Sequence, residues 1–406
     1  MRLSLLKNTF LFVVLILLGC ADQQAQNDKN QVVKEMDQTL ALGVDQTQFY
    51  IPILSAKNVA VVANQTSVIY KADGSRTHLV DSLVSRGVQL KKVFAPEHGF
   101  RGEADAGEVV KDGIDTKTGL PIISLYGKNK KPSPEQLSGL DWVIFDIQDV
   151  GARFYTYIST LHYVMEACAE AGISVMVLDR PNPNGHYVDG PVLEMINQSF
   201  VGMHPIPVVH GMTIGEYAKM INGEGWLNNG IKVNLKVIEM SGYSHDMTYS
   251  LPIRPSPNLP NDKSINLYPS LCFFEGTAVS AGRGTETQFQ IFGAPFLPSE
   301  DYSYQFTPVT NAGAKYPKFK NEPCNGKDLR DNPKLDAINL EWLIQAYEDS
   351  PEKEKFFNNF FVKLAGTNDL QQQIENGWDQ NKIRESWQQG LEDFRAKRSK
   401  YLIYPD

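Results

Sequence analysis

The sequence predicts an α/β fold: a Rossmann-like, three-layer domain with a mostly parallel sheet, followed by a smaller α+β domain. Short, continuous apolar runs recur along its first half, and helical patterns lie between several of them. The runs are residues 59–62, 90–94, 122–125, 142–147, 173–178 and 206–209. Strands buried on both faces are continuously apolar, so this alternation indicates a parallel sheet with helices on both sides.

The helices are predicted from apolar spacing and from their end signals. Residues 154–168 carry apolar side chains at intervals of three or four, and Gly172 closes that helix. A second pattern runs from about residue 77 to 85, and Thr213 with Glu216 forms a capping box that begins another helix. A further amphipathic helix is predicted from Ile383, Trp387, Leu391 and Phe394.

Chain length and proline density predict two folded domains. About 360 residues follow the N-terminal region, more than a single apolar core usually serves. Prolines cluster between residues 252 and 261. We therefore expect a Rossmann-like domain over residues 43–258 and a C-terminal domain over residues 259–406.

The N-terminus has the pattern of a bacterial lipoprotein signal. Arg2 and Lys7 precede an apolar run over residues 10–18, which ends in Leu17-Leu18-Gly19-Cys20. The run is shorter than the roughly twenty residues that a membrane-spanning helix needs. The sequence thus predicts a signal peptide over residues 1–19, acylation of Cys20 and a lipid-anchored protein of the cell envelope.

Composition constrains partners and cysteine chemistry. Residues 20–42 begin with a polar stretch and are expected to form a flexible, lipidated linker. The whole chain has 39 basic and 47 acidic side chains, so nucleic acid is not an expected partner. Of the other cysteines, Cys168 falls on the apolar stripe of a helix, whereas Cys272 and Cys324 could pair or remain free.

Polar side chains follow each predicted strand. Because the carboxyl ends of parallel strands meet at one edge of a sheet, these side chains are expected to form a pocket. They are Asn64; Glu97, His98 and Arg101; Tyr126; Gln148, Asp149, Arg153 and Tyr155; Arg180 and Asn182; and His210.

The sequence lacks the motifs of several common catalytic and cofactor-binding sites. The sequence contains no G-x-G-x-x-G or Walker pattern, no G-x-S-x-G elbow and no H-E-x-x-H helix. A metal site built from Glu97, His98, Asp149 and His210 is conceivable, although no spacing selects it. Carboxylates and amides mixed with aromatic rings suit a polyol such as a sugar.

Longer strings of residues resemble the exo-β-N-acetylmuramidase family, glycoside hydrolase family 171. The strings are Ala95-Pro96-Glu97-His98-Gly99, Asp149-Val150-Gly151-Ala152-Arg153-Phe154-Tyr155, Asp179-Arg180-Pro181-Asn182-Pro183, His210-Gly211-Met212-Thr213, Pro255-Ser256-Pro257-Asn258 and Glu275-Gly276-Thr277. The resemblance implies an active site in the cleft between the two domains. It also implies release of terminal N-acetylmuramic acid from the non-reducing ends of peptidoglycan fragments, without a cofactor, in cell-wall turnover and recycling.

The resemblance assigns the acid more clearly than the second catalytic group. Glu97 matches the family's proposed catalytic glutamate and could protonate the leaving oxygen. Asp149 could activate water or hold Arg153 in place, and the 2-acetamido oxygen of the substrate could instead act as nucleophile. A murein-binding lipoprotein that does not cleave its ligand is the alternative function.

The remaining candidates are expected to bind substrate. The lactyl carboxylate of muramic acid needs a cation, for which Arg153, Arg180 and Arg283 are candidates. Tyr126 and Tyr155 could stack on sugar rings, and His98 and His210 could orient polar groups. The other expected contacts are Asn64, Arg101, Gln148, Asn182, Asn258 and Glu275. Ala278 stands where the family often has an amide, which could alter substrate contacts.

Overall fold

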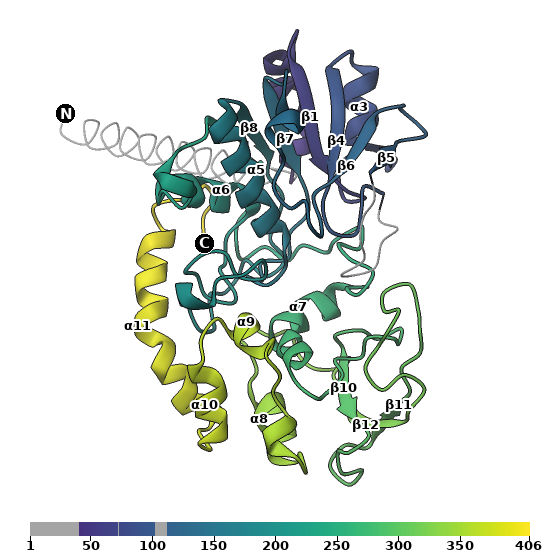
Figure 1. Cartoon of the computed structure of the whole chain (residues 1–406), viewed down its shortest axis with the longest axis vertical. Helices are drawn as coiled ribbons and strands as arrows, with labels where there is room; N and C mark the ends of the chain where they lie inside the picture. The colour runs from purple at the N-terminus through teal and green to yellow at the C-terminus, as the bar shows by residue number, and fades with distance from the viewer. Residues whose placement is uncertain (1–39, 72, 102–111) are drawn as a thin grey trace, which may run out of the picture. The chain divides into compact units, whose positions relative to one another are not determined.

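A seven-stranded sheet forms the centre of the N-terminal half in this computed structural model (Figure 1). The strand order is β5-β6-β4-β1-β7-β8-β9; β5 runs antiparallel to β6, and the other neighbouring pairs are parallel. The strands are β1 (Asn58–Ala63), β4 (Gln89–Ala95), β5 (Gly113–Ile114), β6 (Pro121–Ser124), β7 (Trp142–Asp146), β8 (Ser174–Leu178) and β9 (Leu235–Ile238). The predicted mostly parallel sheet is confirmed.

The structure describes residues 40–71, 73–101 and 112–406. Residues 42–406 form one compact unit. The predicted signal peptide, the acylated Cys20 and most of the predicted linker lie outside the described residues. Within the described ranges, no helix has the length and apolar character needed to cross a membrane.

Five of the six predicted strands are confirmed, and the sixth is wrong. Residues 206–209 contribute only isolated bridges, in which Val209 pairs with Ala152 and Asp189. Pro205 precedes this run and Pro207 lies within it, and both lack the N–H that a central strand donates. The edge position of the sheet is taken by β9, which the sequence does not reveal because its side chains are mostly half-buried or exposed.

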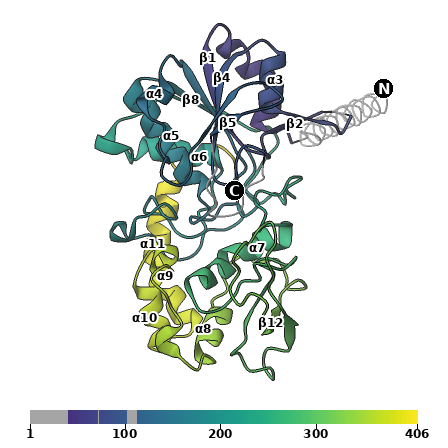
Figure 2. The ribbon, with the colours of Figure 1, turned by 45° about the vertical axis from the view of Figure 1, so that its right-hand side comes forward.

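Helices cover both faces of this sheet and complete the predicted three layers (Figures 1 and 2). Across the sheet, the chain steps from β1 to β4 toward one edge, and from β7 through β8 to β9 toward the opposite edge. Right-handed crossovers therefore place α3 (Leu79–Ser85) on one face and α5 (Tyr157–Ala171) with α6 (Ile214–Gly223) on the other. As predicted, α5 ends at Gly172, which has a φ of +68°.

The C-terminal half combines a small sheet with helices, as predicted. Its strands are antiparallel in the order β10-β12-β11. Its elements are α7 (Asp262–Leu271), η5 (Cys272–Gly276), β10 (Ile291–Ala294), β11 (Tyr304–Phe306), β12 (Cys324–Asp328), α8 (Glu341–Glu348), η6 (Lys353–Lys355), α9 (Phe361–Ala365), α10 (Asp369–Glu375) and α11 (Gln380–Arg398). The last of these confirms the predicted amphipathic helix.

Short elements complete the N-terminal half. They are η1 (Gly43–Asp45), α2 (Thr47–Tyr50), η2 (Pro52–Leu54), the hairpin of β2 (Val68–Tyr70) and β3 (Arg76–His78), α4 (Pro134–Leu137), η3 (Met195–Asn197) and η4 (Asn228–Gly230). Because β3 takes residues 76–78, α3 begins two residues later than the sequence predicts.

The two halves share one apolar core. Phe154, at the start of the α5 region, packs edge-on against Tyr268 and Phe273 of the C-terminal half, with ring centroids 5.3 and 6.0 Å apart. Cys168, Cys272 and Cys324 are all buried and free. The open question about the last two is thereby resolved, because they do not form a disulfide.

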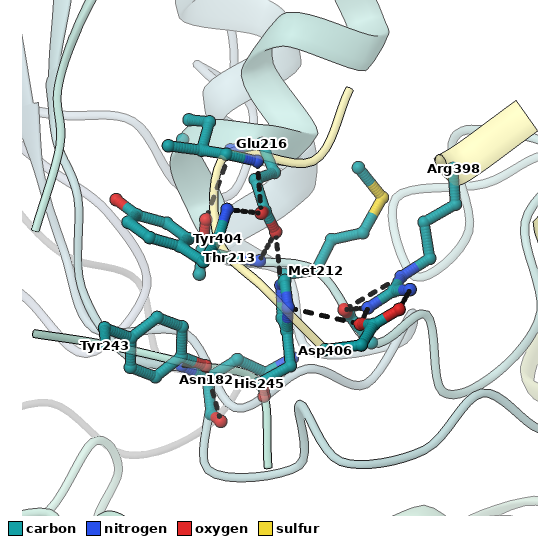
Figure 3. Close-up of polar contacts among 12 residues, drawn as sticks. Asn182, Met212, Thr213, Glu216, Tyr243, His245, Arg398, Tyr404 and Asp406 are labelled. Atoms are coloured by element: carbon teal, nitrogen blue, oxygen red, sulfur yellow. Dashed lines mark hydrogen bonds and ion pairs between the residues drawn. The ribbon is translucent and has the colours of Figure 1, made fainter. Parts of the chain in front are cut away.

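The end of the chain returns to the N-terminal half (Figure 3). The Glu216 carboxylate accepts hydrogen bonds from the Thr213 backbone N–H at 2.9 Å, from His245 Nε2 at 2.8 Å and from the Ile403 N–H at 2.8 Å. The first of these bonds, with that from the Glu216 N–H to the Thr213 hydroxyl, confirms the predicted capping box. Arg398 pairs with Asp406 at 2.7 Å and also donates to a backbone carbonyl of the N-terminal half.

Arg153 joins three segments of backbone. Its side chain is fully buried, and its two terminal nitrogens donate to the carbonyls of Pro191, Ile206, Leu364 and Ala365 at 2.7 to 2.8 Å. A Cβ on Gly366 would lie 2.6 Å from Nη2, so this approach requires glycine. The guanidinium thus connects the loop after β8 to α9 of the C-terminal half.

We predict that Arg153→Met lowers the free energy of unfolding by about 3 kcal/mol or more, because four buried carbonyls lose their donor. Denaturant titration followed by fluorescence measures this loss. Arg330→Met, which breaks an exposed pair with Asp328, is the control and should cost less than about 1 kcal/mol. Equal losses in the two variants would contradict the connecting role of Arg153.

Candidate active site

A cavity of about 140 Å³ lies between the two halves. Six residues that the sequence predicts for the site line it: Glu97, His98, Tyr155, Asn258, Glu275 and Arg283. The other lining residues are Phe154, Thr156, Tyr157, Val201, Ser256, Leu259, Tyr268, Cys272, Phe289, Phe360 and Leu364. Carboxyl, amide and guanidinium groups therefore face a space that is otherwise walled by rings and aliphatic side chains.

Glu97 enters the cavity from a tight turn at the end of β4. The Gly99 N–H donates to the Pro96 carbonyl at 3.0 Å, and His98 within the turn has a φ of +69°. A non-glycine residue in this region stores backbone strain, which occurs preferentially at functional sites. The Thr156 hydroxyl, at the start of α5, donates to Glu97 Oε2 at 2.6 Å. The half-buried carboxyl is thus oriented by two elements of the N-terminal half.

Two tyrosines tie this wall to the segment that leads into the C-terminal half. The Tyr155 and Tyr157 hydroxyls both donate to the Pro255 carbonyl, at 2.9 and 3.3 Å. Asn64 donates to the Tyr157 hydroxyl at 2.9 Å and is itself fully buried. Burial raises the pKa of both phenols well above the usual value, so they remain neutral donors. Asn64 acts here through Tyr157 and does not line the cavity.

Asp149 and His210 form a buried pair behind the cavity. Neither is among the cavity-lining residues, and Asp149 Oδ2 lies 3.9 Å from His210 Nε2. His210 Nδ1 accepts from the Met212 N–H, which places the imidazole proton on Nε2, toward Asp149. Burial raises the pKa of Asp149 to about 7 and lowers that of His210 to about 3. Among the described residues, Asp149 Oδ1 and His210 Nε2 have no hydrogen-bond partner.

Several other predicted site residues hold the strand-end loops in place. Arg180 pairs with Asp146, with its Nε 2.6 Å from Asp146 Oδ1, and Gln148 donates to the carbonyl of Pro181 at 2.6 Å. Asn182 donates to the carbonyl of Met212 at 2.9 Å (Figure 3). These side chains are buried by their partners and do not line the cavity. The same holds for Arg153, whose donors reach backbone carbonyls.

Two predicted residues lie toward the surface near the sheet edge. Arg101 forms a two-pronged pair with Asp115, at 3.0 and 2.9 Å. Tyr126 follows β6 and packs at 6.3 Å against the ring of Phe200.

The cavity lining includes Glu97 and His98 but not Asp149 and His210, so the four candidate metal ligands do not converge.

The far wall belongs to the C-terminal half. Arg283 Nη1 lies 3.2 Å from Glu275 Oε2, and Nη2 donates to the carbonyl of Gly313 at 3.1 Å. Lys318, which is mostly buried, donates to the carbonyls of Phe274 and Thr277 at 2.7 Å each and thereby fixes the segment carrying Glu275. Of the three predicted arginines, Arg283 is the one that lines the cavity in the part of the chain that the structure describes.

Asn258 presents an unused amide to the cavity. It is 3% exposed, and among the described residues neither polar atom of its side chain has a hydrogen-bond partner. A buried amide without partners is costly unless a ligand or water satisfies it. Asn258 is therefore suited to binding a polar group of a ligand.

The sequence missed the orienting role of Thr156 and the apolar wall. Thr156 lies between the two tyrosines at the start of a predicted helix, and this position beside a strand-end loop was an available signal. Tyr268, Phe289 and Phe360 come from the C-terminal half, where aromatic residues in the sequence are expected to belong to the apolar core. No local signal distinguishes a ring that faces a cavity from one that faces the core.

Taken together, the α/β fold and a cavity with an oriented carboxyl, an unpaired amide and aromatic walls are what a carbohydrate-cleaving enzyme, a glycoside hydrolase, requires. Comparison with protein families narrows the class. The N-terminal model of exo-beta-N-acetylmuramidase NamZ matches residues 59–263, and the C-terminal model matches residues 266–404. The chain therefore belongs to the NamZ family of exo-β-N-acetylmuramidases, as its motifs imply.

Individual relatives agree with this assignment. The chain is 39% identical to the peptidoglycan beta-N-acetylmuramidase NamZ of Bacillus subtilis, over 98% of this chain and 100% of the relative. Two solved structures of DUF1343 family proteins from Bacteroides fragilis are also similar. One is 44% identical, with a TM-score of 0.83 and coverage of 91% of this chain and 99% of that one. The other is 28% identical, with a TM-score of 0.76 and coverage of 90% and 99%.

We predict that Asp149→Asn makes stability less sensitive to pH. Because the pKa of Asp149 is raised to about 7, the folded protein binds more protons than the unfolded chain between about pH 4 and pH 7. This carboxyl therefore lowers stability as the pH rises, and Asn removes its titration. Relative to wild type, the variant should gain more than about 1 kcal/mol between pH 5 and pH 7 in denaturant titrations. Parallel stability curves would rule out this titration.

Proposed function

We propose that this protein releases terminal N-acetylmuramic acid from the non-reducing ends of peptidoglycan fragments, with Glu97 as the general acid. The relative from Bacillus subtilis is named for activity on peptidoglycan. The observation that carries the proposal is the position of Glu97, whose carboxyl lines the cavity and accepts the Thr156 hydroxyl at 2.6 Å. A general acid must lie within hydrogen-bond reach of the oxygen that it protonates.

The reaction requires proton transfer to the leaving oxygen and a nucleophile at the anomeric carbon. Glu97 supplies the proton as the glycosidic bond breaks. The other carboxyl lining the cavity in the described residues, Glu275, is paired with Arg283, and Asp149 lies behind the wall. We therefore favour the substrate's own 2-acetamido oxygen as nucleophile. The acetamido oxygen displaces the protonated leaving group, and water then opens the cyclic intermediate to give free N-acetylmuramic acid, so this route retains the anomeric configuration. Direct attack by water inverts it, and proton NMR of the first-formed anomer distinguishes the two.

Groups specific to muramic acid have matching partners in the cavity. The unpaired amide of Asn258 suits the acetamido group, which offers one donor and one acceptor. The Arg283 guanidinium suits the lactyl carboxylate, because it has five N–H donors and the bonds to Glu275 and Gly313 use two of them. The rings of Tyr155 and Tyr268 supply the apolar surface on which a sugar ring can pack.

The N-terminal lipoprotein signal, which ends in Leu17-Leu18-Gly19-Cys20, supports a location at the cell envelope. An acyl group on Cys20 and a polar linker would tether the enzyme to a membrane, close to the cell wall and its fragments. This location suits a role in cell-wall turnover and recycling.

We predict that Glu97→Gln lowers kcat for hydrolysis of a MurNAc-GlcNAc disaccharide by about 100-fold or more. Liberated N-acetylmuramic acid, measured by liquid chromatography, is the readout. Glu352→Gln, an exposed change, is the control and should retain wild-type activity. If the wild-type protein bound the disaccharide without cleaving it, the murein-binding alternative would replace the enzyme. Loss of activity on adding a chelator would instead indicate a metal-dependent hydrolase.

We predict that Arg283→Met raises KM for a chromogenic muramic acid glycoside about 10-fold or more, because the lactyl carboxylate loses a charge-assisted pair. The matched substrate is the N-acetylglucosamine glycoside, which lacks the lactyl group. The ratio of kcat/KM between the two substrates should fall in the variant. An unchanged ratio would show that another group recognises the carboxylate.

We predict that Cys20→Ala releases the full-length protein from the membrane fraction, because the acylated residue is removed. Fractionation of the expressing bacteria followed by immunoblotting measures the distribution. Metabolic labelling with a palmitate analogue should mark the wild type and not the variant. Incorporation of the label into the variant would contradict acylation at this residue.

A further inference from the structure

A cluster of aromatic rings lies beside the mouth of the cavity and has no role in the steps above. Phe200 stacks on Tyr163 with ring centroids 6.2 Å apart and an interplanar angle of 18°, and it contacts Tyr126 at 6.3 Å. The ammonium group of Lys130 lies 4.3 Å from the Phe200 ring centre. All four side chains are half-buried. We call Tyr126, Tyr163, Phe200 and Lys130 the aromatic platform.

One turn connects the aromatic platform to the cavity. Ser199 and Gly202 exchange two backbone hydrogen bonds, at 2.9 and 3.0 Å, so Phe200 and Val201 form the tip of a tight hairpin. Val201 lines the cavity, whereas its neighbour Phe200 belongs to the platform. The two surfaces are therefore continuous across a single pair of residues.

The platform also borders Glu97 through both elements that hold it. Tyr126 follows β6, and β6 pairs with β4, from which the Glu97 turn emerges. Tyr163 lies on α5 seven residues after Thr156, a rise of about 10 Å along the helix. A saccharide that leaves the cavity past Glu97 would meet these rings.

We propose that the aromatic platform binds the leaving-group side of the substrate, the saccharide beyond the scissile bond. The inference rests on the proposed exo-glycosidase function, because such an enzyme encloses one terminal sugar and leaves the rest of the chain outside. Half-exposed rings stack on the apolar faces of sugars, as aromatic side chains do with flat apolar surfaces generally. Lys130 adds a cation, which suits a carboxylate such as the lactyl group of the next muramic acid.

Binding measurements in the Glu97→Gln background test the platform without turnover. Isothermal titration calorimetry is run with N-acetylmuramic acid, MurNAc-GlcNAc and MurNAc-GlcNAc-MurNAc. Phe200→Ala should weaken the two longer ligands about 10-fold relative to the monosaccharide. Lys130→Met should weaken the trisaccharide about 5-fold relative to the disaccharide, because the second lactyl carboxylate loses its cation. Ile196→Ala, an exposed change preceding the same hairpin, is the control and should leave these ratios unchanged.

Each result has a definite meaning. If Phe200→Ala matched Ile196→Ala, or weakened the monosaccharide as much as the longer ligands, the platform proposal would be overturned. If Lys130→Met weakened the disaccharide and trisaccharide equally, Lys130 would not recognise the carboxylate. Thermal melts of each variant establish that the fold persists. Failure of the wild-type enzyme to cleave MurNAc-GlcNAc would overturn the proposed function separately, since these affinities do not depend on cleavage.

Discussion

The cavity depends on one buried guanidinium. Arg153 donates to four carbonyls that belong to the loop after β8 and to α9, and these segments carry Val201 and Leu364 into the cavity wall. A guanidinium has five N–H donors in a fixed plane, so it can hold several carbonyls at set distances, as an ammonium group cannot. The two halves keep their spacing through this residue and through the aromatic contacts of Phe154.

Such a site is composite, and neither half contains it. The N-terminal half supplies Glu97 and Thr156, and the C-terminal half supplies Glu275, Arg283 and most of the rings. The strand order places the ends of β1 and β7 side by side where the chain reverses direction, the usual ligand position in open parallel sheets. In this protein the end of the neighbouring strand β4 contributes Glu97, while both halves supply the remaining lining of the cavity.

The sequence predicted the sheet and the position of Glu97 at the cavity better than the positions of the surrounding polar groups. Five strands were readable because burial on both faces leaves a continuous apolar run. The run at residues 206–209 had the same apolar character, but Pro205 before it and Pro207 within it lack the N–H groups that strand pairing requires. Arg153 and Arg180 were plausible substrate ligands because the sequence around a strand-end arginine is the same whether its side chain faces a cavity or is bound by another part of the protein. Their partners, at Leu364 and Asp146, come from other parts of the chain, and local sequence does not encode such pairings.

The contacts of residues 403 and 404 have a consequence for the stability of the N-terminal half. Asp179 accepts the Tyr404 hydroxyl at 2.7 Å, and Glu216 accepts the Ile403 N–H, so two carboxyls buried near the first sheet receive donors from the last residues. Without residues 403 and 404, both buried carboxyls would lose donors that the rest of the N-terminal half does not supply. The N-terminal half is therefore not expected to be stable without this segment, and the two halves should unfold as one unit.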